Sequence, residues 1–154
     1  MGRGSVIAVG AEAPEFTGTT SEGAPFALSS TRGRPLVLYF YPKANTPGCT
    51  QEARGFTEHY EEFRRAGVAV VGVSVDDVGT QRDFVERCGI PFPIVADRDR
   101  SISRRYGVLG LLGFSRRVTF FIDPDGRVAH VVEGMMPGPH LRAALERLGH
   151  SPSP

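Results

Sequence analysis

The sequence predicts an α/β protein built on a central mixed β-sheet with helices on both faces. Strand and helix patterns alternate along the chain, in the order strand, helix, strand, helix, strand, helix, hairpin, helix, which is typical of layered α/β folds. Leu36–Tyr41 and Val68–Val75 are almost entirely apolar, as central strands covered on both sides usually are. Asp123–Gly126 ends in Asp-Gly between the runs Val118–Ile122 and Arg127–Val132, which predicts an antiparallel hairpin.

The first part of the chain is expected to contain little regular structure. Glycine and proline punctuate residues 1–16, which predicts an irregular lead-in. Phe26–Leu28 is expected to form a short edge strand after a turn at Glu22-Gly23. Thr31–Pro35 then forms the turn that leads into the strand Leu36–Tyr41.

A helix is expected from Cys49 onward. Its apolar residues follow at steps of three and four, so they lie on one stripe. Gly67 supplies the stop expected just beyond a helix C-terminus. The residues of the stripe are Ala53, Phe56, Tyr60 and Phe63.

A second helix is expected to begin near Thr80. Thr80, as the N-cap residue, and Asp83, three residues later, resemble a helix start. The helix then runs to Arg87 or Cys88 and ends at Gly89.

Shorter elements complete the chain. Phe92–Val95 is expected to form a strand, and Asp99–Arg105 a helix that stops at Gly107. An amphipathic helix follows Pro139, and residues 150–154 are expected to be a disordered tail. The apolar face of that last helix consists of Leu141, Ala144, Leu145 and Leu148.

Length and composition predict one soluble domain over residues 1–154. The chain has 154 residues, of which 40% are hydrophobic and 23% charged. The net charge is +1 and the basic residues are scattered, so no nucleic-acid partner is expected. The apolar runs are too short to cross a bilayer, and the N-terminus lacks the apolar run of a signal peptide. No membrane partner and a cytoplasmic location are therefore expected.

Cys49 and Cys88 are the only cysteines, which is too few for a disulfide framework. Cys49 follows a strand and a Pro-Gly turn, and it begins a helix. Free backbone N–H groups and the positive end of the helix dipole favour a thiolate there. A buried structural cysteine is the ordinary alternative, but the position of Cys49 predicts a reactive nucleophile.

Three kinds of neighbour would complete a site around Cys49. The Thr46 hydroxyl could hydrogen-bond the thiolate or an oxygen-bearing substrate, although a turn or cap role is common for threonine. Pro42 has no N–H and could shield the thiolate, or it could simply end the strand. An arginine would stabilise a thiolate and polarise an O–O bond. The candidate arginines are Arg117, Arg116, Arg105, Arg104 and Arg54.

The region around Cys49 resembles a known family. Residues 42–49, Pro-Lys-Ala-Asn-Thr-Pro-Gly-Cys, fit the peroxiredoxin pattern of Pro, three residues, Thr, two residues and Cys. The longer string Tyr39–Ala53 resembles the branch of bacterioferritin comigratory protein, or peroxiredoxin Q. The resemblance extends to residues 9–16, to Val71–Asp76 and to the Arg-x-Thr-Phe-x-Ile-Asp string at Arg117–Asp123. It covers about residues 6–148, which would form the core of the single domain.

The resemblance implies a thioredoxin-like fold and a thiol-dependent peroxidase of antioxidant defence. Cys49 would be the peroxidatic cysteine, Thr46 and Arg117 the pair that activates the peroxide, and Pro42 the shield. Hydrogen peroxide or an organic hydroperoxide would oxidise Cys49 to a sulfenic acid, which a thiol must reduce. Thioredoxin or another small thiol is the expected reductant. The expected protein has no cofactor and is a monomer or a weak homodimer.

The role of Cys88 is open at this point. Many relatives in this branch carry a resolving cysteine five residues after the peroxidatic one, where this chain has Arg54. Others place it in the later helix, near Val85, and Cys88 lies three residues further on. Cys88 could resolve the Cys49 sulfenic acid as an intramolecular disulfide after local unfolding. It could equally be packing at a helix end, with an external thiol recycling Cys49.

Residues 107–114 depart from the family pattern because they are apolar and glycine-rich. This loop could be a mobile rim of the peroxide pocket that favours organic hydroperoxides, a dimer contact, or a segment packed on the core. The histidines share no ligand spacing, so no metal site is expected. They are His59, His130, His140 and His150.

Two rival functions use the same fold. A disulfide oxidoreductase or a copper-delivery protein would need a second thiol close after Cys49, and the next four residues offer none. A non-catalytic binding module or a redox sensor is the remaining alternative. A binding module would not need Pro42, Thr46, Cys49 and Arg117 together.

Overall fold

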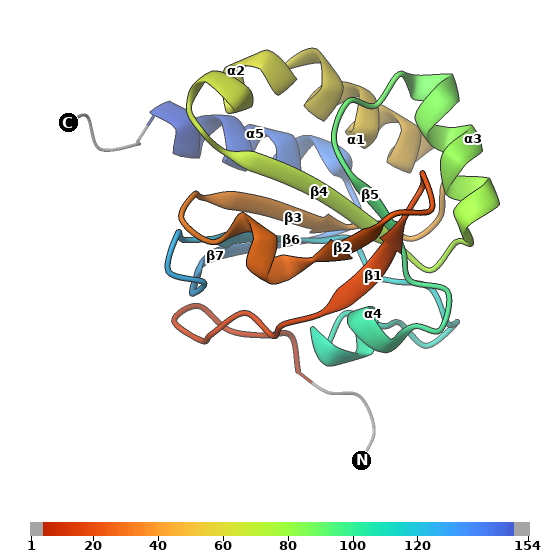
Figure 1. The fold of residues 1–154 in the computed structure, drawn as a ribbon, viewed down its shortest axis with the longest axis horizontal. Helices are drawn as coiled ribbons and strands as arrows, with labels where there is room; N and C mark the ends of the chain where they lie inside the picture. Colours follow the sequence, from red (N-terminus) through yellow and green to blue (C-terminus); the bar gives the residue numbers. More distant parts are fainter. Residues whose placement is uncertain (1–4, 150–154) are drawn as a thin grey trace.

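Residues 5–149 are described by the structure, a computed structural model, and their strands form one seven-stranded sheet (Figure 1). The strand order is β2-β1-β5-β4-β3-β6-β7. The strands are β1 Thr17–Thr20, β2 Pro25–Ala27, β3 Leu36–Phe40, β4 Ala69–Ser74, β5 Ile94–Ala96, β6 Val118–Ile122 and β7 Val128–Glu133. The helices are α1 Pro47–Glu58, α2 Tyr60–Arg65, α3 Val78–Cys88, α4 Ser101–Arg105 and α5 Pro137–Gly149, with a 3₁₀ turn, η1, at Leu28–Thr31.

The centre of the sheet is mixed, as the sequence predicts. β3 runs parallel to β4 and antiparallel to β6. Successive side chains of a strand point to opposite faces, and β3 is apolar on both. Leu38 and Phe40 therefore join one buried cluster, while Val37 and Tyr39 join the other. This strand carries the chain to the loop that ends at Cys49.

Helices cover both faces of the sheet, which confirms the predicted layering. In Figure 1, α1, α2, α3 and α5 lie above the sheet and α4 lies below it. The lower layer is completed by the N-terminal segment, whose Ala13 and Phe16 are buried in the same cluster as Ile102 of α4. Helix α1 packs against α5, and the approach is close because a methyl group at Gly55 would lie 2.6 Å from the Leu141 side chain.

The prediction of a single helix after Cys49 is wrong, because two helices occupy that stretch. α1 ends at Glu58, and His59, with φ −102° and ψ 8°, separates it from α2. The predicted stripe still faces the core, since Phe56 and Phe63 are fully buried and their rings lie 5.9 Å apart. The break therefore redirects the chain without moving its apolar face away from the sheet.

One strand was missed, and two other expectations need correction. The strand β1, Thr-Gly-Thr-Thr, was not predicted, because it is polar and contains glycine. Leu28 belongs to η1 and not to the edge strand, which is Pro25–Ala27. Asp77, and not Thr80, caps α3, since its side chain accepts a hydrogen bond of 2.8 Å from the Thr80 backbone N–H.

The remaining boundaries agree with the prediction to within a few residues. The hairpin joins β6 to β7 through Asp123–Gly126, with a register shift between Phe121 and Ile122. The expected tail at residues 150–154 lies outside the described residues. Among residues 5–149, every helix is too short or too polar to cross a membrane.

Candidate active site

Cys49 lies in the first turn of α1 and is 1% exposed. β3 delivers the chain to this point, and Thr46 precedes the helix with extended backbone angles, φ −91° and ψ 157°. Pro47 is the first helical residue, where its missing N–H costs nothing. The first-turn N–H groups of α1 have no partner within the helix, so the Cys49 sulfur lies at the positive end of the helix dipole.

The loop before Cys49 is fastened to α3 and to the end of β4. The Ala44 N–H donates a 2.7 Å hydrogen bond to Asp76 Oδ2. The Asn45 side chain donates to Asp83 Oδ2 of α3 at 3.2 Å. Asn45 has φ +66°, a left-handed conformation that asparagine tolerates better than most residues. These contacts fix the direction in which the chain enters α1.

Thr46 and Pro42 lie in this loop, and each has the local role that the sequence analysis left open, in a turn and at the end of a strand. The Thr46 hydroxyl donates a 2.7 Å hydrogen bond to the Lys43 carbonyl. It makes no capping bond to α1, so the first-turn N–H groups stay available to a substrate. Pro42 is half-buried and ends the run of β3.

Arg117 reaches the Cys49 sulfur from the start of β6. Its Nη2 donates to Cys49 Sγ at 3.5 Å, and its Nη1 donates to Glu52 Oε1 at 2.5 Å. Its Nε donates to the Met135 carbonyl at 2.7 Å. A methyl group at Gly48 would lie 3.0 Å from Nη2, so the glycine before Cys49 leaves room for the guanidinium. Three anchored donors hold this side chain in one orientation.

The other candidate arginines lie elsewhere. Arg116 donates to the Gly107 carbonyl at 2.8 Å and pairs with Glu133 at 3.5 Å. Arg105 donates to the Glu15 carbonyl at 2.6 Å. The last two, Arg54 and Arg104, are exposed.

Glu52 is a site residue that the sequence reasoning missed. It is 1% exposed, and its second oxygen is buried without a hydrogen-bond partner among residues 5–149. Burial raises the pKa of Glu52 to about 7, although the neighbouring Arg117 charge opposes that rise. Burial acts to lower the pKa of Arg117, but the charges of Glu52 and Cys49 outweigh it and raise that pKa. The sequence did hold one signal for Glu52. It lies three residues after Cys49, and residues at that spacing share a helix face.

Cys88 belongs to the same side of the sheet as Cys49. Both cysteines are free thiols, with Cys49 buried and Cys88 partly exposed at the end of α3. Gly89 follows in a left-handed conformation with φ +64°, which is typical of a helix end. The Tyr39 hydroxyl is buried without a hydrogen-bond partner among the described residues. Burial raises the pKa of Tyr39, and the nearby Tyr41 and Glu52 raise it further. Tyr39 and Cys49 belong to one buried cluster, and Cys88 packs against it.

The loop 107–114 is buried at its start and exposed at its tip. Val108 is fully buried, whereas Leu111-Leu112 is more than four-fifths exposed, at 82% and 87%. Phe114 is 40% exposed, and the Lys43 ammonium lies 5.7 Å from the centre of its ring. The loop therefore packs on the core and also contacts the segment that leads to Cys49. Within residues 5–149, no three histidine, cysteine or acidic side chains gather as a metal site would require.

Comparisons with known proteins show the family and the fold of the chain. The family model described as AhpC/TSA matches residues 9–131. The peroxiredoxin bcp of Coxiella burnetii is 36% identical over 149 residues, which cover 92% of this chain and 99% of that protein. The structure of peroxidoxin BcpB from Mycobacterium tuberculosis is 34% identical, with a TM-score of 0.87 over 94% of this chain and 98% of that one.

A second solved structure has the same fold. The bacterioferritin comigratory protein of Xanthomonas campestris is 32% identical, with a TM-score of 0.82 over 88% of this chain and 90% of that one. The thioredoxin-like fold expected from the sequence is thereby confirmed. The chain belongs to the AhpC/TSA family of peroxiredoxins, in the branch of bacterioferritin comigratory protein and peroxiredoxin Q, and it is a thiol peroxidase.

Proposed function

We propose that Cys49 is the peroxidatic nucleophile of this peroxidase and that Arg117 is its activating residue. The observation that carries the proposal is the 3.5 Å contact between Arg117 Nη2 and Cys49 Sγ, inside a site where both residues are buried. A fixed guanidinium beside a sulfur stabilises the thiolate more strongly in a buried site than in water. The helix dipole of α1 acts in the same direction.

In the proposed reaction the Cys49 thiolate attacks the terminal oxygen of the peroxide. The sulfur–oxygen bond forms as the O–O bond breaks, and the leaving oxygen takes up a proton to become water or an alcohol. Cys49 is left as a sulfenic acid. Arg117 Nη2 and the first-turn N–H groups of Gly48 and Cys49 are donors for the negative charge that develops on the oxygens. Thr46 binds the peroxide, and Pro42 limits access of water to the sulfur.

We propose that the enzyme accepts organic hydroperoxides as well as hydrogen peroxide. The exposed apolar side chains of Leu111, Leu112 and Phe114, in a loop that contacts Lys43, support this range. The Xanthomonas campestris protein was studied for its alkyl peroxide reduction activity. An apolar rim near the sulfur would favour the alkyl part of such a substrate.

We propose that Cys88 resolves the sulfenic acid by forming an intramolecular disulfide, which thioredoxin or another small thiol then reduces. Cys88 lies at the end of α3, beside Gly89, so a local opening of the helix end frees it. If Cys88 is only packing, the external thiol reduces Cys49 directly. The proposed protein acts in the cytoplasm, where two free thiols stay reduced, as a monomer or a weak homodimer.

A coupled assay tests the proposal. Peroxide consumption is measured with thioredoxin, thioredoxin reductase and NADPH, for hydrogen peroxide and for an alkyl hydroperoxide. The native chain should turn over both, and Cys49→Ser neither. Turnover with a small thiol but not with thioredoxin would change the proposed reductant alone. Absence of turnover with every peroxide and thiol would contradict the catalytic proposal and favour the non-catalytic binding module or the redox sensor.

A further inference from the structure

We propose that His140 is a positioning residue for the peroxidase reaction. It holds the turn between β7 and α5, and the Met135 carbonyl in that turn holds the guanidinium of Arg117 against Cys49. His140 acts through the backbone and through Arg117, and it touches no reacting atom. The inference rests on the role proposed above for Arg117.

The contacts of His140 fix which ring nitrogen carries the hydrogen. His140 is fully buried, with Nε2 2.8 Å from the Gly134 carbonyl oxygen and Nδ1 2.8 Å from Thr119 Oγ1. A carbonyl oxygen can only accept, so Nε2 must donate to it. In a neutral ring the other nitrogen has no hydrogen, so Nδ1 accepts from the Thr119 hydroxyl. The ring therefore links β6 to the turn after β7.

The surroundings favour the neutral ring. Burial lowers the pKa of His140, the bond to Gly134 acts in the opposite direction, and the nearby Arg117 charge lowers it further. A neutral His140 with one donor and one acceptor satisfies both neighbours, and the Thr119 hydroxyl is correspondingly buried. The link is thus a fixed structural connection near neutral pH.

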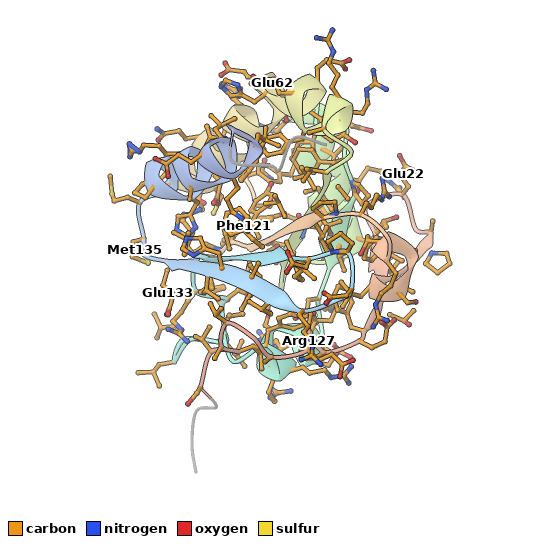
Figure 2. All side chains as sticks on the ribbon, turned by 90° about the vertical axis from the view of Figure 1, so that its left-hand side faces the viewer. Glu22, Glu62, Phe121, Arg127, Glu133 and Met135 are labelled. Carbon is orange, nitrogen blue, oxygen red and sulfur yellow. The ribbon has the colours of Figure 1, made fainter. Side chains whose placement is uncertain are left out.

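The turn that His140 holds is short and depends on backbone contacts. Figure 2 shows Met135 where β7 passes into α5. Gly134 has φ +141°, its N–H donates to the Arg117 carbonyl at 3.3 Å, and its carbonyl accepts from His140. The Met135 and Met136 side chains are 68% and 70% exposed, so they contribute little packing that would hold the turn. His140 therefore supplies a side-chain anchor from the buried side.

The turn between β7 and α5 also sets the orientation of Arg117. Its Nε donates to the Met135 carbonyl at 2.7 Å. A guanidinium is planar and its donors have a fixed geometry, so anchoring Nε directs Nη1 towards Glu52 and Nη2 towards Cys49. A shift of the Met135 carbonyl would tilt this plane and weaken the contact with the sulfur.

The test compares His140→Leu, His140→Gln and Thr119→Val with the native chain. His140→Leu removes both hydrogen bonds, Thr119→Val removes one, and His140→Gln keeps a donor and an acceptor. His130→Gln is the matched control, because His130 is an exposed histidine of β7 that stacks on Phe121. The readouts are the second-order rate constant for Cys49 oxidation, the thiolate absorbance against pH, and the urea midpoint.

His140→Leu should slow the oxidation on the order of tenfold, the effect expected when a buried hydrogen-bonding partner is lost. Its thiolate should form at higher pH, because the guanidinium no longer faces the sulfur. Thr119→Val should change both in the same direction, His140→Gln should recover part of the loss, and His130→Gln should match the native chain. The rate constant and the thiolate absorbance report on the site, whereas the urea midpoint reports on folding.

Two results would overturn the inference. One is a folded His140→Leu chain with the native rate constant and thiolate titration. If His140→Leu does not fold, native behaviour of both Thr119→Val and His140→Gln has the same meaning. Arg117→Lys separates this inference from the proposed function. If Arg117→Lys slows oxidation while the His140 variants do not, only the His140 inference fails, and if Arg117→Lys has no effect, both fail.

Discussion

The guanidinium of Arg117 lies 3.5 Å from the Cys49 sulfur, although 68 positions separate the two residues in the chain. β6 brings Arg117 beside β3, and β3 leads to the loop and helix that hold Cys49. The sheet register therefore decides the distance between the charge and the thiol. This contact is the one through which Arg117 would activate the Cys49 sulfur.

Replacing Arg117 by lysine should slow Cys49 oxidation on the order of a hundredfold, as loss of a fixed donor to developing charge typically does. Lysine keeps the positive charge but cannot hold Glu52, the Met135 carbonyl and the sulfur with one planar group. Stopped-flow oxidation of the reduced chain measures the rate constant. Arg116→Lys is the neighbouring control and should keep the native rate. Equal rates for the two variants would refute the role of Arg117.

Replacing Glu52 by glutamine should remove a pH dependence of stability. The pKa of Glu52 is raised from 4.5 to about 7 in the folded chain. The folded chain therefore binds this proton more tightly than the unfolded chain does. The contribution of protonated Glu52 to the free energy of unfolding is therefore fully present below about pH 4.5, and it is lost as pH rises to about 7.

Urea unfolding of the Glu52→Gln and native chains at the two ends of that pH window measures the effect. As pH rises, the native chain should lose unfolding free energy relative to the Glu52→Gln chain. Glu58→Gln, at an exposed position of the same helix, should show no such trend. A difference that stays constant across the window would show that Glu52 does not titrate there.

Replacing Thr46 by valine should slow the reaction with peroxide on the order of tenfold, a loss of about 1.4 kcal/mol that is typical of one hydrogen bond. Valine has nearly the same shape but lacks the hydroxyl, which also donates to the Lys43 carbonyl. Thr46→Ser keeps the hydroxyl and should keep most of the rate. The measurement is the same stopped-flow experiment. Valine and serine variants of equal rate would exclude a role for the hydroxyl.

Replacing Cys88 by serine should trap the oxidised enzyme as a sulfenic acid. After one equivalent of peroxide, the native chain should lose two hydrogens in intact mass as the disulfide forms. Cys88→Ser should instead gain one oxygen. A native chain that also gains one oxygen and forms no internal disulfide would mean that an external thiol recycles Cys49.

Sequence patterns predicted the elements whose burial is uniform. β3, β4 and β6 are buried along their whole length, so their apolar runs gave clear signals. The polar strand β1 gives no such signal, because its place depends on pairing with β2 and β5. The break at His59 likewise has no glycine or proline beside it, so it follows from packing on the sheet.

For the site, sequence reasoning found the loop residues and the family pattern singled out Arg117 among five arginines. Local patterns cannot reveal contacts that depend on the fold. The Met135 carbonyl is a backbone group, so its residue type carries no information about Arg117. His140 contacts Thr119 and Gly134 across elements that the sequence separates. Glu52 alone had a local signal, its spacing of three from Cys49.

The most direct test asks whether the peroxide oxidises the Cys49 sulfur to a sulfenic acid. The Cys88→Ser chain is treated with one equivalent of hydrogen peroxide in the presence of dimedone, which labels sulfenic acids, and is then digested and mapped by tandem mass spectrometry. If Cys49 is the peroxidatic nucleophile, a stoichiometric dimedone adduct should form on Cys49. Consumption of the peroxide with an unlabelled Cys49 that remains a free thiol would contradict it.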